Sequence, residues 1–162
     1  PRRRRRTVTR PVEIAVERLA HATGLPLPQR ATAGAAGIDL LAAIGEDEEL
    51  EIGRFCRVLV PTGLRIALPE GYEAQVRPRS GLAARNGITV LNSPGTVDSD
   101  YRGEIKVILI NLGGFPFTVK RGMRIAQMVV APVISVEWKE RKVGAHESER
   151  GDGGFGSTGT DP

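Results

Sequence analysis

Short stretches that alternate apolar and polar residues recur along most of the chain. Residues 12–18, Val-Glu-Ile-Ala-Val-Glu-Arg, are typical of a half-buried β-strand, and Pro26 and Pro28 then favour an extended connection. The pattern predicts a fold that starts near Pro11 and consists mostly of short strands. Further β-rich runs, bounded by Pro and Gly, lie at residues 40–44, 55–60, 64–68, 72–76, 88–91, 105–110, 117–119, 125–130 and 133–136.

One stretch predicts a helix instead of a strand. Residues 80–86, Ser-Gly-Leu-Ala-Ala-Arg-Asn, begin with a serine suited to the N-cap and end at Asn86-Gly87, which suits a helix C-terminus. One short helix among many strands predicts an all-β domain of jelly-roll or barrel type. After about Lys142 the pattern stops, which divides the chain into a tail at 1–10, a β domain at 11–142 and a glycine-rich arm at 143–162.

Length and composition fit one globular domain. The chain has 162 residues, of which 40% are hydrophobic and 26% are charged. No apolar run approaches the roughly 20 residues that span a bilayer, so we expect no membrane-spanning segment. The 20 glycines are more than average composition gives, which favours many tight turns between strands.

The positive charge is concentrated in the N-terminal tail. Arg2 to Arg6 and Arg10 supply six charges, and the remaining 17 Lys and Arg residues against 19 acidic residues leave a net charge of −2. The tail is either a solvated terminus or a segment that binds nucleic acid or directs targeting. Because Cys56 is the only cysteine, no internal disulfide can form, and we expect an intracellular, cytoplasmic protein, or a nuclear one if the source is eukaryotic.

The C-terminal arm carries groups suited to a nucleotide. Gly151, Gly153 and Gly156 formally match G-x-G-x-x-G, but a dinucleotide-binding fingerprint needs a preceding strand and a following helix, and only six residues follow Gly156. The segment still offers backbone N–H donors, and the Phe155 ring could stack on a base. The alternative is a disordered tail whose phenylalanine packs on a neighbouring surface. The side chains that could bind phosphate here are those of Arg150, Ser157 and Thr158.

Three internal segments contain further candidate groups. The run Asp98-Ser99-Asp100-Tyr101-Arg102-Gly103 offers a general base or a magnesium ligand, although such residues also form ordinary turns. Asp39 is either a turn former or an acid that contacts magnesium through water. Arg79 and Ser80 stand where the predicted helix exposes free N–H groups, which suits an anion, although simple capping by Ser80 explains the serine equally well.

The residue inventory excludes other chemistries. His21 and His146 are the only histidines, and no carboxylate or thiol motif lies near His21 in the sequence, so a Ser-His-Asp or Cys-His site is not expected. One cysteine and two scattered histidines also argue against zinc. Hydrolysis by this chain would depend on carboxylates, phosphate-binding groups and magnesium.

Five motifs follow one another along the chain. They are Ala36-Gly37-Ile38-Asp39-Leu40, Pro78-Arg79-Ser80-Gly81-Leu82-Ala83, Gly95-Thr96-Val97-Asp98-Ser99-Asp100-Tyr101-Arg102-Gly103, Gly122-Met123-Arg124-Ile125-Ala126-Gln127 and Arg150-Gly151-Asp152-Gly153-Gly154-Phe155-Gly156-Ser157-Thr158-Gly159. Together and in this order they resemble the trimeric dUTPase family. The resemblance covers roughly residues 11–159 and leaves only the arginine tail outside.

The resemblance implies a jelly-roll-like (β-clip) homotrimer that hydrolyses dUTP to dUMP and pyrophosphate. Three active sites would lie at subunit interfaces, each closed by the arm of a neighbouring chain. Asp98 would activate the water that attacks the α-phosphorus, and Tyr101 would pack on the deoxyribose and exclude a 2′-hydroxyl. Such an enzyme limits uracil incorporation into DNA and supplies dUMP for thymidylate synthesis.

The remaining site residues are assigned by the same resemblance. Asp39 would meet Mg²⁺ through water, with the ion held mainly by substrate phosphates, and Phe155 would stack over the uracil. Arg150 would bind the γ-phosphate, and Lys106 matches a substrate-contact position that varies in the family. The uracil edge would be read by Asn92, Thr96, Val97 and Asp98, and the phosphates would be held by Arg79, Ser80, Gly81, Gln127, Gly156, Ser157 and Thr158.

Two alternatives stay open at this point. A dCTP deaminase, or an enzyme that both deaminates and cleaves, would share the fold and the nucleotide class, but it needs a carboxylate beside the ring. A non-enzymatic binding module would use the arginine tail on nucleic acid, and removal of residues 1–10 would abolish its salt-sensitive binding. The dUTPase interpretation requires neither a membrane nor a nucleic acid.

Overall fold

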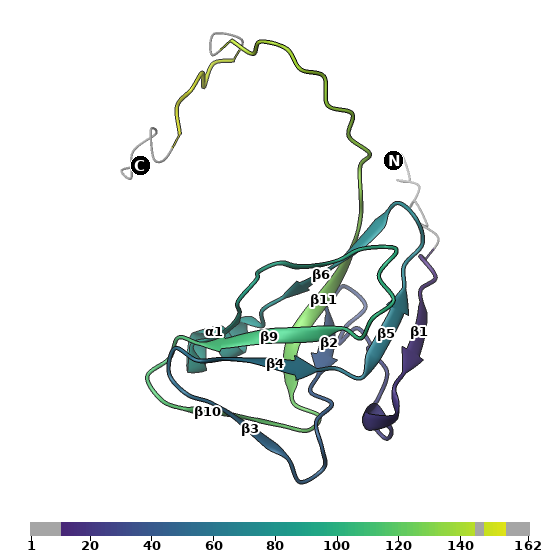
Figure 1. The fold of residues 1–162 in the computed structure, drawn as a ribbon, viewed down its shortest axis with the longest axis vertical. Helices are drawn as coiled ribbons and strands as arrows, with labels where there is room; N and C mark the ends of the chain where they lie inside the picture. The colour runs from purple at the N-terminus through teal and green to yellow at the C-terminus, as the bar shows by residue number, and fades with distance from the viewer. Residues whose placement is uncertain (1–10, 145–147, 155–162) are drawn as a thin grey trace, which may run out of the picture.

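The computed structural model describes residues 11–144 and 148–154, and this part of the chain is built mainly of β-strands (Figure 1). Among the described residues, α1 is the only α-helix, so the prediction of an all-β, jelly-roll-like fold with one short helix is confirmed. The elements are β1 (Ala15–Arg18), the 3-10 helix η1 (Ala20–Ala22), β2 (Ile38–Leu41), β3 (Glu49–Ile52), β4 (Arg57–Pro61), β5 (Leu64–Ala67), β6 (Tyr72–Arg77), α1 (Ser80–Asn86), β7 (Ile88–Val90), β8 (Gly95–Val97), β9 (Lys106–Asn111), β10 (Phe117–Lys120) and β11 (Arg124–Pro132).

Two larger antiparallel sheets carry the core. One has the strand order β2-β11-β6-β8, and the other has the order β4-β9-β7, while β1 pairs with β5 and β3 with β10. Burial alternates along the strands, as in β9, where Val107 and Leu109 are buried and Lys106 is exposed. The buried side chains of both larger sheets belong to one hydrophobic cluster, which includes Leu40 and Val60. Burial of these apolar surfaces together is the main force that holds the two sheets face to face.

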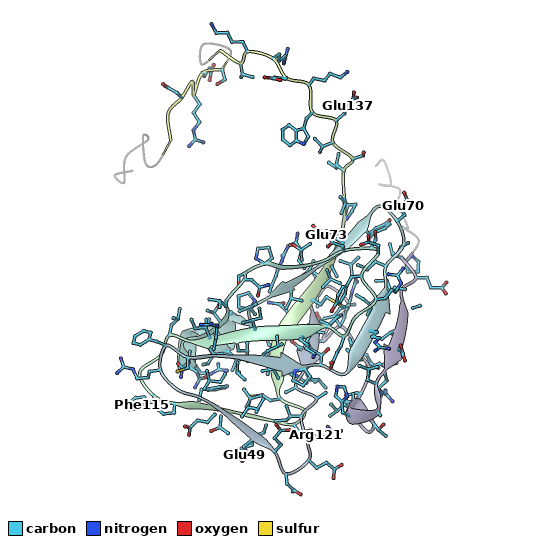
Figure 2. The ribbon with its side chains drawn as sticks, viewed as in Figure 1. Glu49, Glu70, Glu73, Phe115, Arg121 and Glu137 are labelled. Atoms are coloured by element: carbon cyan, nitrogen blue, oxygen red, sulfur yellow. The ribbon has the colours of Figure 1, made fainter. Side chains whose placement is uncertain are left out.

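Asn111 is a fully buried polar residue that organises the turn after β9. Its Nδ2 donates hydrogen bonds to the carbonyls of Ile52 and Phe115, both at 2.8 Å, and its Oδ1 accepts one from the N–H of Gly113 at 2.8 Å. The buried amide is therefore satisfied, as burial of a polar group requires. The turn that it holds presents the Phe115 ring, 83% exposed, at the same end of the molecule as α1 (Figure 2).

The helix α1 occupies the predicted residues, but its N-terminus differs from the prediction. Arg79, with φ −95° and ψ 126°, takes the N-cap position without a side-chain hydrogen bond, so the expectation that Ser80 caps the helix is wrong. Ser80 instead lies inside the first turn, where its backbone is already helical. The C-terminus follows the prediction, because Gly87 adopts φ 67° and its N–H bonds to the carbonyl of Ala83.

Three strand predictions need correction. Residues 133–136 form no strand, since the single hydrogen bond from the N–H of Val133 to the carbonyl of Gly71 is their only backbone pairing within the described chain, and Ile134 is 83% exposed. The strand predicted from Phe55 begins at Arg57, because Phe55 has φ 59°. Two strands, β3 and β8, are missing from the prediction, whereas the other predicted strands lie within three residues of their expected ends.

Beyond β11 the chain leaves the β domain as an extended exit segment, residues 133–144 (Figure 1). The N–H of Val133, the first residue of the exit segment, donates a hydrogen bond to the carbonyl of Gly71 in the β domain at 2.8 Å. Further along, Val136 and Trp138 are 63% and 92% exposed. Within residues 11–144 and 148–154, no helix has the length and apolarity needed to cross a membrane.

Candidate active site

The first group of predicted site residues surrounds Asp39 on β2. Its Oδ1 lies 2.9 Å from Nε of Arg79, and its Oδ2 lies 3.5 Å from Nε of Arg124. The antiparallel pairing of β2 with β11 sets Gln127 directly opposite Asp39. Residues from three separate motifs therefore meet here, and we call Asp39, Arg79, Arg124 and Gln127 the Asp39 cluster.

Gln127 ties β11 to the segment that leads into α1. Its Nε2 donates a hydrogen bond to the carbonyl of Pro78 at 2.9 Å. A Cβ atom on Gly37 would lie 2.2 Å from Oε1 of Gln127, so glycine at that position leaves the space that the amide fills. Ser80 and Gly81, the first two residues of α1, follow Arg79 directly. The predicted phosphate-binding residues of the β domain are thus adjacent in space.

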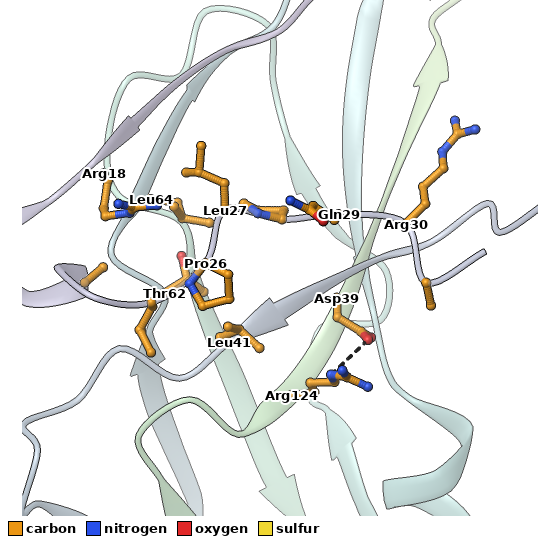
Figure 3. A pocket seen from close by; sticks show the side chains of 14 residues that line it. Arg18, Pro26, Leu27, Gln29, Arg30, Asp39, Leu41, Thr62, Leu64 and Arg124 are labelled. Carbon is orange, nitrogen blue, oxygen red and sulfur yellow. Dashed lines mark ion pairs between the residues drawn. The ribbon is translucent and has the colours of Figure 1, made fainter. Parts of the chain in front are cut away.

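A cavity of about 270 Å³ lies beside this cluster (Figure 3). Asp39 and Arg124, joined by their ion pair, line one part of the cavity, and residues 25–31 line another. Arg18 and Arg30 also contribute, so the lining contains three guanidinium groups and one carboxylate. Its excess of positive charge suits an anionic ligand or an acidic segment of another chain.

The second group of predicted residues lines a separate cavity of about 150 Å³, the Tyr101 cavity. Thr96 and Val97 come from β8, Asp98 follows that strand directly, and Lys106 begins β9. The N–H of Tyr101 donates a hydrogen bond to the carbonyl of Asp98 at 3.2 Å, which closes the turn between them. The side chain of Asp98 is exposed, so it is open to solvent and to a ligand. The full lining is Thr96, Val97, Asp98, Tyr101, Glu104, Ile105 and Lys106.

The Tyr101 ring is held against its own loop. Its hydroxyl donates a hydrogen bond to the carbonyl of Glu104 at 3.0 Å. A Cβ atom added to Gly103 would lie 2.3 Å from this hydroxyl oxygen and 2.9 Å from a ring carbon, so the ring packs directly on the glycine. Tyr101 is 44% exposed, which leaves part of its surface available to a ligand.

The carboxylate of Glu104 is fixed from several sides. Its Oε1 accepts hydrogen bonds from Nε2 of His21 at 2.7 Å and from the N–H of Gly63 at 2.9 Å, and its Oε2 lies 3.6 Å from Nζ of Lys106. Burial by itself raises the pKa of Glu104, but the hydrogen bonds from His21 and Gly63, with the charges of His21 and Lys106, outweigh it and lower the pKa below its ordinary value. Glu104 is therefore a carboxylate at neutral pH.

Asn92 lies in the turn between β7 and β8, which contains the cis bond Ser93–Pro94. A Cβ atom on Gly95 would lie 3.1 Å from Nδ2 of Asn92, so the amide is close to the first residue of β8. The hydroxyl of Ser93 donates a hydrogen bond to the carbonyl of Val90 and stabilises the turn. Asn92 itself is exposed, and the cavity-lining residues begin at Thr96.

The Asp39 cluster and the Tyr101 cavity stand apart in one chain. β2 and β8 are the two edge strands of the four-stranded sheet, with β11 and β6 between them. Three strand spacings separate these edges by roughly 14 Å. Each chain therefore presents two part-sites rather than one enclosed pocket.

The described residues 148–154 of the arm lie away from both part-sites of their own chain (Figure 1). Arg150 is one of these residues, and its Nε donates a hydrogen bond to the carbonyl of Gly153 at 2.9 Å. Its guanidinium is exposed. The predicted site residues Phe155, Gly156, Ser157 and Thr158 lie outside the described residues.

Sequence reasoning missed three residues of the Tyr101 region. Glu104 and Ile105 directly follow the Asp98–Gly103 motif, and their position in the chain was the available signal. His21 gave no such signal, because it stands 83 residues from Glu104 and no acidic motif lies beside it in the sequence. The fold packs η1 against the turn at Gly63 and so brings His21 to the carboxylate of Glu104.

Comparison with known proteins gives a consistent result. The sequence model of the dUTPase family matches residues 23–159. The chain is 59% identical over 147 residues to the deoxyuridine 5′-triphosphate nucleotidohydrolases of Brucella melitensis biotype 2 and Brucella suis biovar 1, covering 91% of this chain and 93% of each relative.

Solved structures share the fold at low sequence identity. A single-residue mutant of the dUTPase of Staphylococcus bacteriophage 80alpha, solved with dUpNHpp, superposes with a TM-score of 0.76 at 23% identity, over 91% of this chain and 99% of that one. A mutant of the dUTPase from phage phi11 of S. aureus, described as coordinating a structural Mg(II) ion, gives a TM-score of 0.70 at 19% identity, over 81% and 97%. Because the family model spans most of the sequence and the Brucella relatives match nearly end to end, the chain belongs to the dUTPase family and is an enzyme that hydrolyses dUTP to dUMP.

Proposed function

We propose that Asp98 is the general base of this hydrolysis. It would accept a proton from a water molecule whose oxygen attacks the α-phosphorus of dUTP, and the bond from that phosphorus to the bridging oxygen would break. The products are dUMP and pyrophosphate. One observation carries the proposal: Asp98 is an exposed carboxylate on the lining of the Tyr101 cavity, in a chain of the dUTPase family.

The Tyr101 cavity would hold the nucleoside. The ring of Tyr101 would pack on the deoxyribose and leave no space for a 2′-hydroxyl, so that ribonucleotides are rejected by shape. Asn92 and the β8 backbone from Thr96 to Asp98 would read the uracil edge. Lys106, on the same lining, would contact the substrate with its ammonium group.

The Asp39 cluster would bind the triphosphate. Arg79, Ser80 and Gly81 offer a guanidinium and the free N–H groups at the start of α1, and Gln127 adds a neighbouring amide. The guanidinium groups of Arg79 and Arg124, which pair with Asp39, would also contact the phosphates when substrate binds.

The residues present fit a magnesium ion that is held mainly by substrate. Among residues 11–144 and 148–154, no group of three or more His, Cys, Asp or Glu side chains could form a protein-only site, and Asp39 stands without a second carboxylate. Mg²⁺ commonly binds through one carboxylate, substrate phosphates and water. Asp39 would hold it through a water, and the bound ion would neutralise charge on the phosphate chain.

We infer that the working enzyme is a homotrimer whose active sites are shared between chains. The separation of the two part-sites supports this, because a neighbouring chain could bring its Asp39 cluster to the Tyr101 cavity. The exposed apolar side chains of the exit segment support an arm that packs on another subunit. That arm would deliver Arg150 to the γ-phosphate and Phe155 to the uracil, and the remaining arm contacts would come from Gly156, Ser157 and Thr158.

The proposed division of the chain follows from these roles. Residues 11–142 form the β domain that carries both part-sites, residues 143–162 form the arm, and residues 1–10 have no part in catalysis. The reaction would lower the cellular dUTP pool, which limits uracil incorporation into DNA, and would supply dUMP for thymidylate synthesis. We place it inside the cell, in keeping with the single free cysteine, Cys56.

The decisive assay measures pyrophosphate release from dUTP, dCTP, dTTP and UTP in parallel, with Mg²⁺ and then with a chelator, while chromatography identifies the product. We expect conversion of dUTP alone to dUMP, stimulated by magnesium. Turnover of dCTP would favour a deaminase-related activity instead. Full activity in the chelator would contradict the proposed role of magnesium.

Asp98→Asn tests the general base. The amide keeps the shape of the side chain but cannot accept the proton, so turnover should fall by about 100-fold or more while dUTP still binds. Single-turnover kinetics and the affinity for a non-hydrolysable dUTP analogue separate these two effects. The matched control is Asp47→Asn, an exposed acid of the β2–β3 connection outside both part-sites. Unchanged turnover in Asp98→Asn would remove Asp98 from the mechanism.

A further inference from the structure

The ion pair between His21 and Glu104 stands out because it joins η1 to the wall of the Tyr101 cavity. The Glu104 side chain is 13% exposed, yet it lines this cavity and borders an open groove that contains His21. The 2.7 Å contact between His21 Nε2 and Glu104 Oε1 is the shortest ion pair that reaches either part-site among the described residues. A largely buried carboxylate remains charged only when such partners hold it.

Glu104 also holds the Tyr101 ring through its backbone, so the position of the Glu104 residue affects the position of the ring. The carbonyl of Glu104 accepts the hydrogen bond from the Tyr101 hydroxyl. The next residue, Ile105, is fixed on both sides, since its N–H donates to the carbonyl of Leu64 at 2.8 Å and its carbonyl accepts from the N–H and the hydroxyl of Thr62. Residues 104–105 are therefore a rigid support from which the tyrosine ring extends.

The opposite end of the pair is also fixed. Arg121 donates hydrogen bonds to the carbonyls of His21, Ile44 and Thr23, at 2.8, 2.6 and 2.8 Å. A Cβ atom on Gly63 would lie 2.2 Å from Cβ of Ala22, so η1 packs tightly on the turn whose N–H also binds Glu104. His21 thus reaches Glu104 from a backbone that cannot easily shift.

We propose that His21 and Glu104 form a positioning pair that sets the Tyr101 side of the nucleoside cavity and thereby contributes to substrate affinity and to discrimination against ribonucleotides. This inference rests on the proposed nucleoside role of the Tyr101 cavity. Neither residue is a catalytic residue: His21 acts through Glu104, and Glu104 acts through Tyr101 and Lys106. The effect on the reaction should appear in binding rather than in the chemical step.

The variants Glu104→Gln and His21→Leu test the pair. Glu104→Gln keeps the side-chain shape but removes the charge, and His21→Leu removes the donor. In each, we expect KM for dUTP to rise about fivefold and the preference for dUTP over UTP to fall by a similar factor, with kcat changed less than about twofold. His21→Gln, which retains an N–H donor, should recover most of the loss. In the double variant, the rise in KM and the loss of preference for dUTP should be no greater than in the more affected single variant, because both changes remove the same contact.

Glu49→Gln is the matched control. It also breaks an ion pair with an exposed cation, Lys120 on β10, but neither residue lines the Tyr101 cavity or belongs to the Asp39 cluster. Thermal unfolding of each variant checks folding. Lower melting temperatures with unchanged KM and unchanged UTP discrimination would overturn the inference and leave a purely structural pair. Tyr101→Ala separates that result from a failure of the proposed nucleoside role of the Tyr101 cavity, because in that failure this variant would also leave the KM for dUTP and the UTP discrimination unchanged.

Discussion

At the scale of single residues, the described part of the site depends on small side chains beside large ones. Gly103 lies under the Tyr101 ring and Gly37 lies beside the Gln127 amide, each without room for a Cβ atom. Neither glycine has the positive φ that would demand glycine for backbone reasons. Their size alone sets where the neighbouring functional group stands.

Gly103→Ala should displace the tyrosine ring. The added methyl group would overlap the Tyr101 hydroxyl and ring edge, so the ring must rotate away and lose its hydrogen bond to Glu104. We expect the preference for dUTP over UTP to fall by about tenfold, since a wall displaced by about 1 Å loses its shape selection. Steady-state kinetics with both nucleotides measure this. Gly114→Ala, at a position with no atom within 4 Å, is the control and should behave as the unaltered chain.

The pH dependence of stability should report the carboxylate of Glu104. Its pKa is lower in the folded chain than the ordinary 4.5, so its interactions with His21, Gly63 and Lys106 stabilise the fold fully above that value. The stabilisation is lost as pH falls through the lower, folded pKa. Melting temperatures of the unaltered chain and of Glu104→Gln should therefore differ at pH 7 and converge in acid below pH 4.5. A constant difference across this range would contradict the assignment.

Residues with a local sequence signal could be predicted, and residues that need a distant partner could not. Asp98 and Tyr101 stand in one dense polar motif, and the structure brings both to one cavity. Asp39 and Gln127 come together through strand pairing that their motifs imply but do not state. His21 and Glu104 are joined only by the packing of η1 on Gly63, which no pattern in the sequence indicates.

At the scale of elements, the hydrophobic pattern predicts strands well where one face is buried. β9 and β11 supply long apolar runs to the core and were predicted. β3 has only two apolar residues, each preceded by a glutamate, and within the described chain it pairs only with β10. β8 begins with glycine and has three residues, too few to show an alternation of apolar and polar positions. The wrongly predicted strand at 133–136 has the right pattern but no paired strand in the described part of the chain.

The end of α1 illustrates how an element is positioned by a close backbone approach. The N–H of Leu112 donates a hydrogen bond to the carbonyl of Gly87 at 2.9 Å, and a Cβ atom on Gly87 would lie 2.5 Å from the backbone nitrogen of Gly113. Helix and turn therefore meet through two glycines. This contact fixes the helix whose first residues are proposed to bind phosphate.

Gly87→Ala should lower stability by more than its backbone strain alone. Gly71→Ala is the control, because Gly71 also has a positive φ, 81°, but open space around its Cβ position. The control should lower the free energy of unfolding by about 1 kcal/mol. Gly87→Ala should lower it by about 2 kcal/mol more, which corresponds to a further fall of about 4–8 °C in melting temperature. Calorimetry compares the two. Equal melting temperatures would mean that the turn at Gly113 moves aside freely.

At the scale of the whole molecule, we expect the arm to be separable from the β domain. Removal of residues 151–162 should preserve assembly and lower dUTP turnover by about 100-fold, because charge-stabilising donors and the cover over the uracil are lost. Light scattering and turnover are measured together. Removal of residues 1–10 is the control and should leave turnover unchanged. Normal activity without residues 151–162 would show that the arm is dispensable.

The assembly is the least predictable level from one chain. The five motifs and their resemblance to a trimeric family point to shared sites, but hydrophobic periodicity carries no information about partners. In the structure, the sign of incompleteness is the distance between the Asp39 cluster and the Tyr101 cavity. The exposed Trp138 of the exit segment is a second such sign.

The exit segment, which leads the chain away from its own β domain, has a genetic consequence. If each active site draws its general base and its arm from different chains, two inactive proteins with different lesions can complement each other. A chain altered at Asp98 still offers a normal arm, and a chain without its arm still offers Asp98, so mixed trimers of the two would contain some intact sites. Loss of function by one allele could then be partly masked by another, which a self-contained site would never allow.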